Sequence, residues 1–234
     1  MLERTLKITN VLSDPTRFSI YQYICKRHND VTVQEIAEKF GIHANVARLH
    51  LTKLEDVKML VSQTKKTGKG GRPSRYYRLS DEVVSLQFPQ RDFRTIAQIS
   101  LEALEEMGEK GLEVFNNIAY RYGKEEAEKY IQSLGLDISS LSVGEKLRHI
   151  QLIANAQGLN AEIEYNSKKK EASLHIYNCI FKELLNRFSP SLCKMHHSML
   201  QGIFDYFLGD VKLLEKEIMT EGCNKCSYLA VFQH

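Results

Sequence analysis

No apolar run in the 234-residue chain approaches the roughly 18 residues that a transmembrane helix needs. The first ten residues are charged from Glu3 onward and contain no apolar signal core, so we expect no export, no membrane association and a cytoplasmic location. The sequence also lacks internal repeats, a Ser/His/Asp set, a paired-carboxylate motif and a nucleotide-binding fingerprint. These absences argue against a membrane protein and against an enzyme.

Acidic residues are scarce in the first third of the chain. Residues 1–80 contain 15 Lys and Arg against 7 Asp and Glu, whereas residues 81–234 contain 17 against 22. A basic module joined to a mildly acidic one is typical of nucleic-acid binding at one end of a protein. The composition, 43% hydrophobic and 26% charged, is that of an ordinary globular protein, and the length suits two modest domains.

Helical periodicity and turn signals predict an α+β protein with three parts. Residues 1–80 combine four helical patterns with a strand–turn–strand pattern at the end, and Asp14-Pro15, Thr32 and Gly41 mark helix boundaries. Residues 81–136 form a helical linker that we expect to provide the dimer interface. Residues 137–234 contain a helix capped by Ser142, a β-hairpin over 161–178, two helices flanking Pro190 and two closing strands.

Two helices joined by a turn at Gly41 form the core of the first part. In residues 34–54 the apolar side chains fall where two crossed helices bury them, which predicts that His50 packs beneath the second helix. The predicted DNA-contacting residues of this second helix and its start are His43, Ala44, Asn45, Arg48, Thr52 and Lys53. Arg pairs with guanine and Asn with adenine in the major groove, whereas His43 suits a helix cap or a phosphate contact.

A basic hairpin follows this helix directly. Between Val61 and Leu79 there are six cations and no acid: Lys65, Lys66, Lys69, Arg72, Arg75 and Arg78. We expect the lysines to meet phosphates and Arg72 to enter the minor groove, with Arg75 as a further DNA contact. The string GKGGRPS lacks the spacing of a phosphate-binding loop and precedes a strand, so we reject that interpretation.

The segments LSDPTRFSIYQYI, EIAEKFGIHANVARLHLTKLEDVKMLVSQ and GKGGRPSRYYRLS together resemble the winged helix-turn-helix domains of ArsR and DeoR-like bacterial regulators. The resemblance covers the first third of the chain. It implies a transcriptional regulator that binds double-stranded operator DNA.

Four of the five cysteines lie in the last 56 residues: Cys179, Cys193, Cys223 and Cys226. Each falls at a predicted element boundary, and a helix start at Cys193 would favour the thiolate that binds metal. Four thiolates suit a closed zinc site, and the C-x-x-C pair alone suits a redox pair. The remaining alternative is that all four are unreactive thiols buried in the protein. Cys25 fits an apolar helix pattern, and we expect His196, one turn after Cys193, to be solvated.

The segments NCIFKELL, PSLCKMHHSMLQGIF and EGCNKCSYLAVF resemble the sensory half of iron–sulfur-cluster-responsive repressors of the SufR type. That resemblance implies a homodimer and a cluster held by Cys179, Cys193 and one of Cys223 or Cys226. Two alternative functions remain open. One is a regulator that senses a small apolar ligand, with structural zinc or incidental cysteines, and the other is a thiol oxidoreductase using Cys223 and Cys226.

Overall fold

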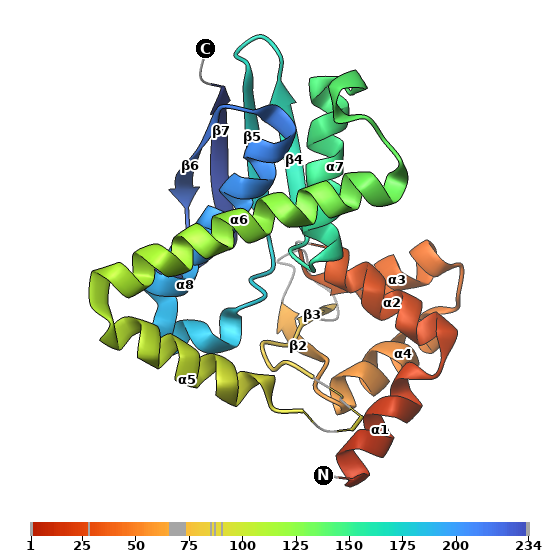
Figure 1. Ribbon diagram of the computed structural model, residues 1–234. Helices are drawn as coiled ribbons and strands as arrows, with labels where there is room; N and C mark the ends of the chain where they lie inside the picture. The colour runs from red at the N-terminus through yellow and green to blue at the C-terminus, as the bar shows by residue number, and fades with distance from the viewer. Residues whose placement is uncertain are drawn as a thin grey trace. The chain divides into compact units, whose positions relative to one another are not determined.

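The structure, a computed structural model, describes residues 2–27, 29–65, 74–84, 86, 88–89 and 91–232. The chain divides into two compact units, Met1–Arg91 and Asp92–His234 (Figure 1). Each unit combines helices with one small antiparallel sheet, which confirms the predicted α+β class.

The first unit is a bundle of four helices with a three-stranded sheet in the order β1-β3-β2. Its elements are α1 (Leu2–Leu12), α2 (Pro15–Lys26), β1 (Val31–Thr32), α3 (Val33–Phe40), α4 (Ala44–Asp56), β2 (Leu60–Lys65) and β3 (Ser74–Leu79). The four helices and the hairpin were expected. Strand β1 was not, because two residues are too few to show alternation and its partner, β3, lies far along the chain.

Local signals set the helix boundaries in this unit. The Asp14 carboxylate accepts a hydrogen bond from the Arg17 backbone N–H at 2.8 Å and caps α2. Gly41 ends α3 in the left-handed region at φ 63°, where glycine has no steric penalty. The crossed helices then bury Ile36, Leu51 and Leu54 completely, whereas Phe40 and Ile42, also expected in this core, are only partly buried.

The second unit packs its helices against a four-stranded sheet in the order β4-β5-β7-β6. Its elements are α5 (Phe93–Glu106), α6 (Gly108–Leu134), η1 (Ile138–Ser140), α7 (Val143–Ala156), β4 (Ala161–Asn166), β5 (Glu171–Ile176), α8 (Lys182–Leu208), β6 (Val211–Glu217), η2 (Met219–Glu221) and β7 (Cys226–Phe232). The main core lies between α7, α8 and one face of this sheet, and it includes the buried Ile150, Phe204 and Leu174. The predicted cap at Ser142 is a complete capping box with Glu145.

Helices α6 and α8 approach each other until their backbones touch. A Cβ atom on Gly202 would lie 2.0 Å from the Tyr120 carbonyl oxygen, and one on Gly123 would lie 2.0 Å from the Met199 carbonyl oxygen. No side chain fits at either position. Beside this contact the Tyr120 hydroxyl donates to the Asp205 carboxylate at 2.8 Å. Helix α6, which lies in the expected linker, is therefore part of the packed second unit.

Helix α8 contains a kink two residues before Pro190. Phe188 has non-helical dihedral angles of φ −116° and ψ 24°, which accommodate the proline ring and its missing N–H. The two predicted helices thus meet in one kinked element. Cys193 lies five residues beyond the kink, past the first helical turn, so it does not occupy the helix start that the sequence suggested. The dipole effect expected for its thiolate is confined to the first turn and does not follow from this position.

Candidate DNA-binding surface and cysteine pocket

Helix α4 presents one face to the core of the first unit and the other to solvent. Ala47, His50, Leu51 and Leu54 are buried on the inner face. Of the predicted DNA-contacting residues, Asn45, Arg48 and Lys53 are exposed, whereas Ala44 and Thr52 are half-buried. Asn45, Arg48 and Lys53 are therefore on the solvent face of α4, the face on which contacts to the major groove were expected.

The first turn of α4 is held by side-chain hydrogen bonds. The His43 Nδ1 atom accepts from the Asn45 backbone N–H at 3.2 Å, so His43 caps the helix. The Arg48 guanidinium donates to the Asn45 side-chain oxygen at 3.0 Å. The two side chains expected to pair with guanine and adenine are thus hydrogen-bonded to each other.

Two apolar residues on the outer face of α4 were missed in the sequence. Val46 is 42% exposed and Leu49 is 55% exposed. Their signal was present in the sequence, because Val46 follows Asn45 and Leu49 follows Arg48 directly on the helix. Apolar groups in this position suit the methyl group of thymine.

A partly buried polar cluster connects α2 to α4. His50 is 8% exposed, as its expected position beneath the helix requires, and its Nδ1 lies 3.5 Å from the Arg17 Nε. Arg17 in turn lies 3.4 Å from the Asp14 carboxylate. Burial lowers the pKa of His50, and the Arg17 backbone N–H lowers the pKa of Asp14. A neutral imidazole and an ionised carboxylate therefore flank Arg17 at neutral pH.

Two of the predicted DNA-contacting residues of the hairpin, Lys65 and Arg75, form ion pairs within the first unit. Lys65 lies 2.8 Å from the Asp30 carboxylate, and Arg75 lies 2.7 Å from Glu55. Both cations are about half exposed, and such surface pairs contribute only about 0–1 kcal/mol, so DNA phosphates can compete for them. The predicted contacts Lys66, Lys69 and Arg72 lie outside the described residues.

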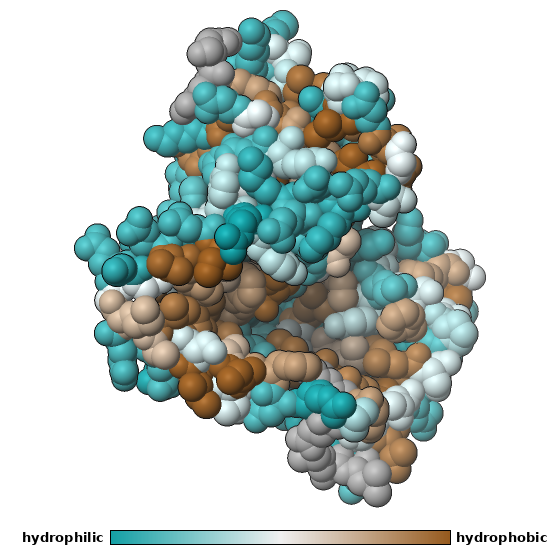
Figure 2. Space-filling model, in the orientation of Figure 1, coloured by the Kyte–Doolittle hydropathy of each residue, from teal (hydrophilic) through white to brown (hydrophobic). Residues whose placement is uncertain are grey.

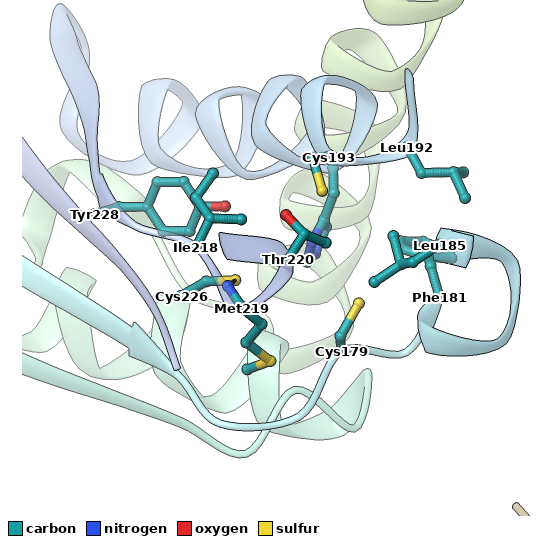
Figure 3. A pocket seen from close by; sticks show the side chains of 11 residues that line it. Cys179, Phe181, Leu185, Leu192, Cys193, Ile218, Met219, Thr220, Cys226 and Tyr228 are labelled. Carbon is teal, nitrogen blue, oxygen red and sulfur yellow. Dashed lines mark hydrogen bonds between the residues drawn. The ribbon is translucent and has the colours of Figure 1, made fainter. Parts of the chain in front are cut away.

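The second unit brings three of the four predicted metal-ligating cysteines to one pocket. Cys226 begins β7 and pairs with Ile176 at the end of β5, and Cys179 lies in the loop that follows β5. Cys193 reaches the same pocket from α8. Figure 3 shows the three thiols around a small space, with Thr220 of η2 between them and Met219 beside Cys226. Three segments that are distant in sequence thus meet here.

The fourth predicted ligand does not line this pocket. Cys223 lies between η2 and β7, half-buried. Cys25 belongs to α2 of the first unit and is half-buried beside Tyr21, so it is less buried than its apolar helix pattern predicted. Among the described residues, no three Cys, His, Asp or Glu side chains already stand close enough together to ligate one metal ion. Ligation by the pocket thiols therefore requires them to move closer.

His196 is part of the pocket, and the expectation that it is solvated is wrong. Its side chain follows Cys193 by one turn, is 7% exposed and lines the same space. Its Nε2 atom is buried with no hydrogen-bond partner among the residues that the structure describes. Burial lowers the pKa of His196 to about 4, so the imidazole is neutral at physiological pH.

Burial also changes the pKa of the pocket thiols. It raises the pKa of both Cys179 and Cys226, and the neighbouring Cys193 thiol adds to this effect. Both thiols are therefore protonated at neutral pH in the absence of metal. A metal that binds them must displace these protons, so its affinity rises with pH.

Comparison with known proteins supports the assignment of the first unit. Residues 12–63 match the family model of a helix-turn-helix domain. The match spans the region from the end of α1 into β2, including α4, and it supports a DNA-binding transcriptional regulator. None of the described helices has both the length and the apolar character that crossing a bilayer requires.

The other comparisons say little about the second unit. No curated protein matches the chain. Among solved structures, the chain is similar to a trafficking protein particle complex subunit 3 from Naegleria fowleri, solved covalently bound to palmitic acid. The two are 13% identical with a TM-score of 0.44, over 60% of this chain and 92% of that one. Similarity at this level does not establish a common fold.

The outer face of α4 yields a first prediction. Arg48→Ala should weaken binding to DNA sequences selected in vitro by the intact protein, and it should relax preference at one base by about 1–3 kcal/mol. Arg148→Ala, which removes an exposed arginine of α7, should change neither property. Mobility-shift titrations against single-base variants of the selected site measure both effects. Unchanged preference in Arg48→Ala would show that α4 does not read the bases.

Proposed function

We propose that this DNA-binding regulator, a repressor by its resemblance, changes its operator affinity when the cysteine pocket binds an iron–sulfur cluster or a metal ion. The observation that carries the proposal is the convergence of Cys179, Cys193 and Cys226 on one pocket. Each thiol comes from a different element. A ligand that binds all three therefore changes how those elements pack.

The chemistry of the donors fits such a ligand. Thiolates are the ligands that iron–sulfur clusters and zinc prefer. An iron–sulfur cluster, when bound, supplies a centre whose charge and integrity depend on the redox conditions. The chain contributes a pocket lined by Leu185, Leu192 and Ile218, which limits the access of water to the thiols.

Contacts between α5 and α8 offer a path from the pocket toward the DNA-binding unit. The buried Ser191 hydroxyl, two residues before Cys193, donates to the Glu105 carboxylate at 2.9 Å. Arg187 lies 2.6 Å from the Glu102 carboxylate. Because α5 is the first helix after Arg91, a shift of α8 near Cys193 would be passed to the helix that follows the DNA-binding unit in the chain.

Operator binding as a homodimer is part of the proposal. Palindromic sites require two recognition helices about one helical turn apart, which a dimer provides. Helices α5 and α6 expose apolar side chains at helical spacing: Phe93, Ile96, Ile99, Val114, Ile118 and Tyr122. Figure 2 shows apolar surface over these two helices. Exposed apolar surface of this kind favours association with a second copy.

Light scattering tests the dimer. The intact protein should have twice the 27.0 kDa mass of one chain, and Ile118→Glu should reduce it toward the single-chain value. Leu152→Glu is the matched control, because Leu152 is an exposed apolar residue of α7, outside the expected interface. A wild-type protein that stays at 27.0 kDa at micromolar concentration would contradict the dimer.

Anaerobic loading with iron and sulfide tests the metal site. We expect visible absorbance that is lost in Cys179→Ser, Cys193→Ser and Cys226→Ser, because each removes one thiolate from the pocket. Cys25→Ser should keep the absorbance, since Cys25 lies in the other unit.

The alternatives predict other outcomes for the same protein. Colourless protein with one zinc per chain would replace the cluster with a structural zinc site. Protein that binds neither iron nor zinc would make the thiols bystanders, and the apolar lining of the pocket would then favour a small apolar ligand.

A further inference from the structure

We propose that His196, through Nε2, supplies the fourth protein ligand of the metal centre in the cysteine pocket, and that Cys223 does not. The inference rests on the proposed function, because it names the ligand set of the same site. It replaces the four-cysteine set with three thiolates and one imidazole.

The surroundings of His196 support this role. A buried polar atom normally has a hydrogen-bond partner, since burial without one is unfavourable. The Nε2 atom of His196 has none among the described residues, although the side chain is only 7% exposed. The ring also lines the pocket that contains the three thiols. A metal ion there would give this nitrogen the partner that it lacks.

The neighbouring histidine shows how an ordinary histidine is placed in the same helix. The His197 Nε2 atom lies 2.8 Å from the Leu213 carbonyl oxygen, and its ring stacks on Tyr228 with centroids 5.6 Å apart. Its hydrogen-bonding need is met by the backbone of β6. Of these two adjacent histidines, only His196 combines a place in the pocket with an unpartnered nitrogen.

Helix geometry gives His196 an advantage over Cys223. Residues three apart in a helix lie on the same face, so Cys193 and His196 approach a common point from one rigid element. Cys223 lies outside the pocket, on the segment between η2 and β7. The remaining two ligands, Cys179 and Cys226, lie in a loop and at a strand end. These two can move toward the fixed pair on α8 when metal binds.

Pulsed electron paramagnetic resonance provides the test. Full-length protein labelled with ¹⁵N-histidine is loaded anaerobically with iron and sulfide and then reduced. We expect hyperfine coupling from one histidine nitrogen in the wild type, in His197→Ala and in Cys223→Ser, and loss of that coupling in His196→Ala. His196→Cys should load iron without nitrogen coupling, which separates loss of a ligand from loss of the fold. If the protein takes up zinc instead, the Co²⁺-substituted protein should show the spectrum of three sulfur ligands and one nitrogen ligand.

The outcomes distinguish this inference from the proposed function. A loaded wild type without nitrogen coupling, or with a Co²⁺ spectrum of four sulfur ligands, would overturn the role of His196 and leave the metal site standing. Loss of metal in Cys223→Ser with retention in His196→Ala would do the same. Wild-type protein that binds neither iron nor Co²⁺ would overturn the proposed function itself, and the inference with it.

Discussion

At Gly123 and Gly202 the backbones of α6 and α8 touch, because neither position has a side chain that would hold the helices apart. This contact fixes α8 within the second unit. Beyond it, Phe204 of α8 packs into the core over the sheet, while Cys193 and His196 line the pocket on the other half of the same helix. The position of the pocket relative to the sheet therefore depends on two glycines that do not line the pocket.

Around the kink at Phe188, α8 also contacts helix α5. The segment around the kink binds α5 through Ser191 and Arg187, and the next turn carries Cys193. Regulation requires that the two states of the pocket differ in free energy of DNA binding, so a bound ligand must change something that reaches the DNA-binding unit. In the proposed regulation α8 has this role, because it lines the pocket and also contacts α5.

Local signals in the sequence predicted local structure well. The cap at Asp14, the turn at Gly41 and the hairpin over residues 161–176 each depend on neighbouring residues. Features that depend on distant residues were not predictable in this way. The ion pairs of Lys65 and Arg75 involve acids 35 and 20 residues away, so the count of acids within the hairpin did not include them. The burial of His196 was not predicted. A helical pattern does not show which face of α8 is covered by the preceding loop, which includes Phe181 against the His196 ring.

The most direct measurement compares the operator affinity of one preparation before and after anaerobic loading with iron and sulfide, at fixed salt concentration. The account predicts a change of about 5- to 150-fold, the usual range for coupled sites, and no change in Cys193→Ser. Equal affinity of the loaded and the metal-free wild type would contradict it, because a centre that binds without changing DNA affinity has no regulatory effect.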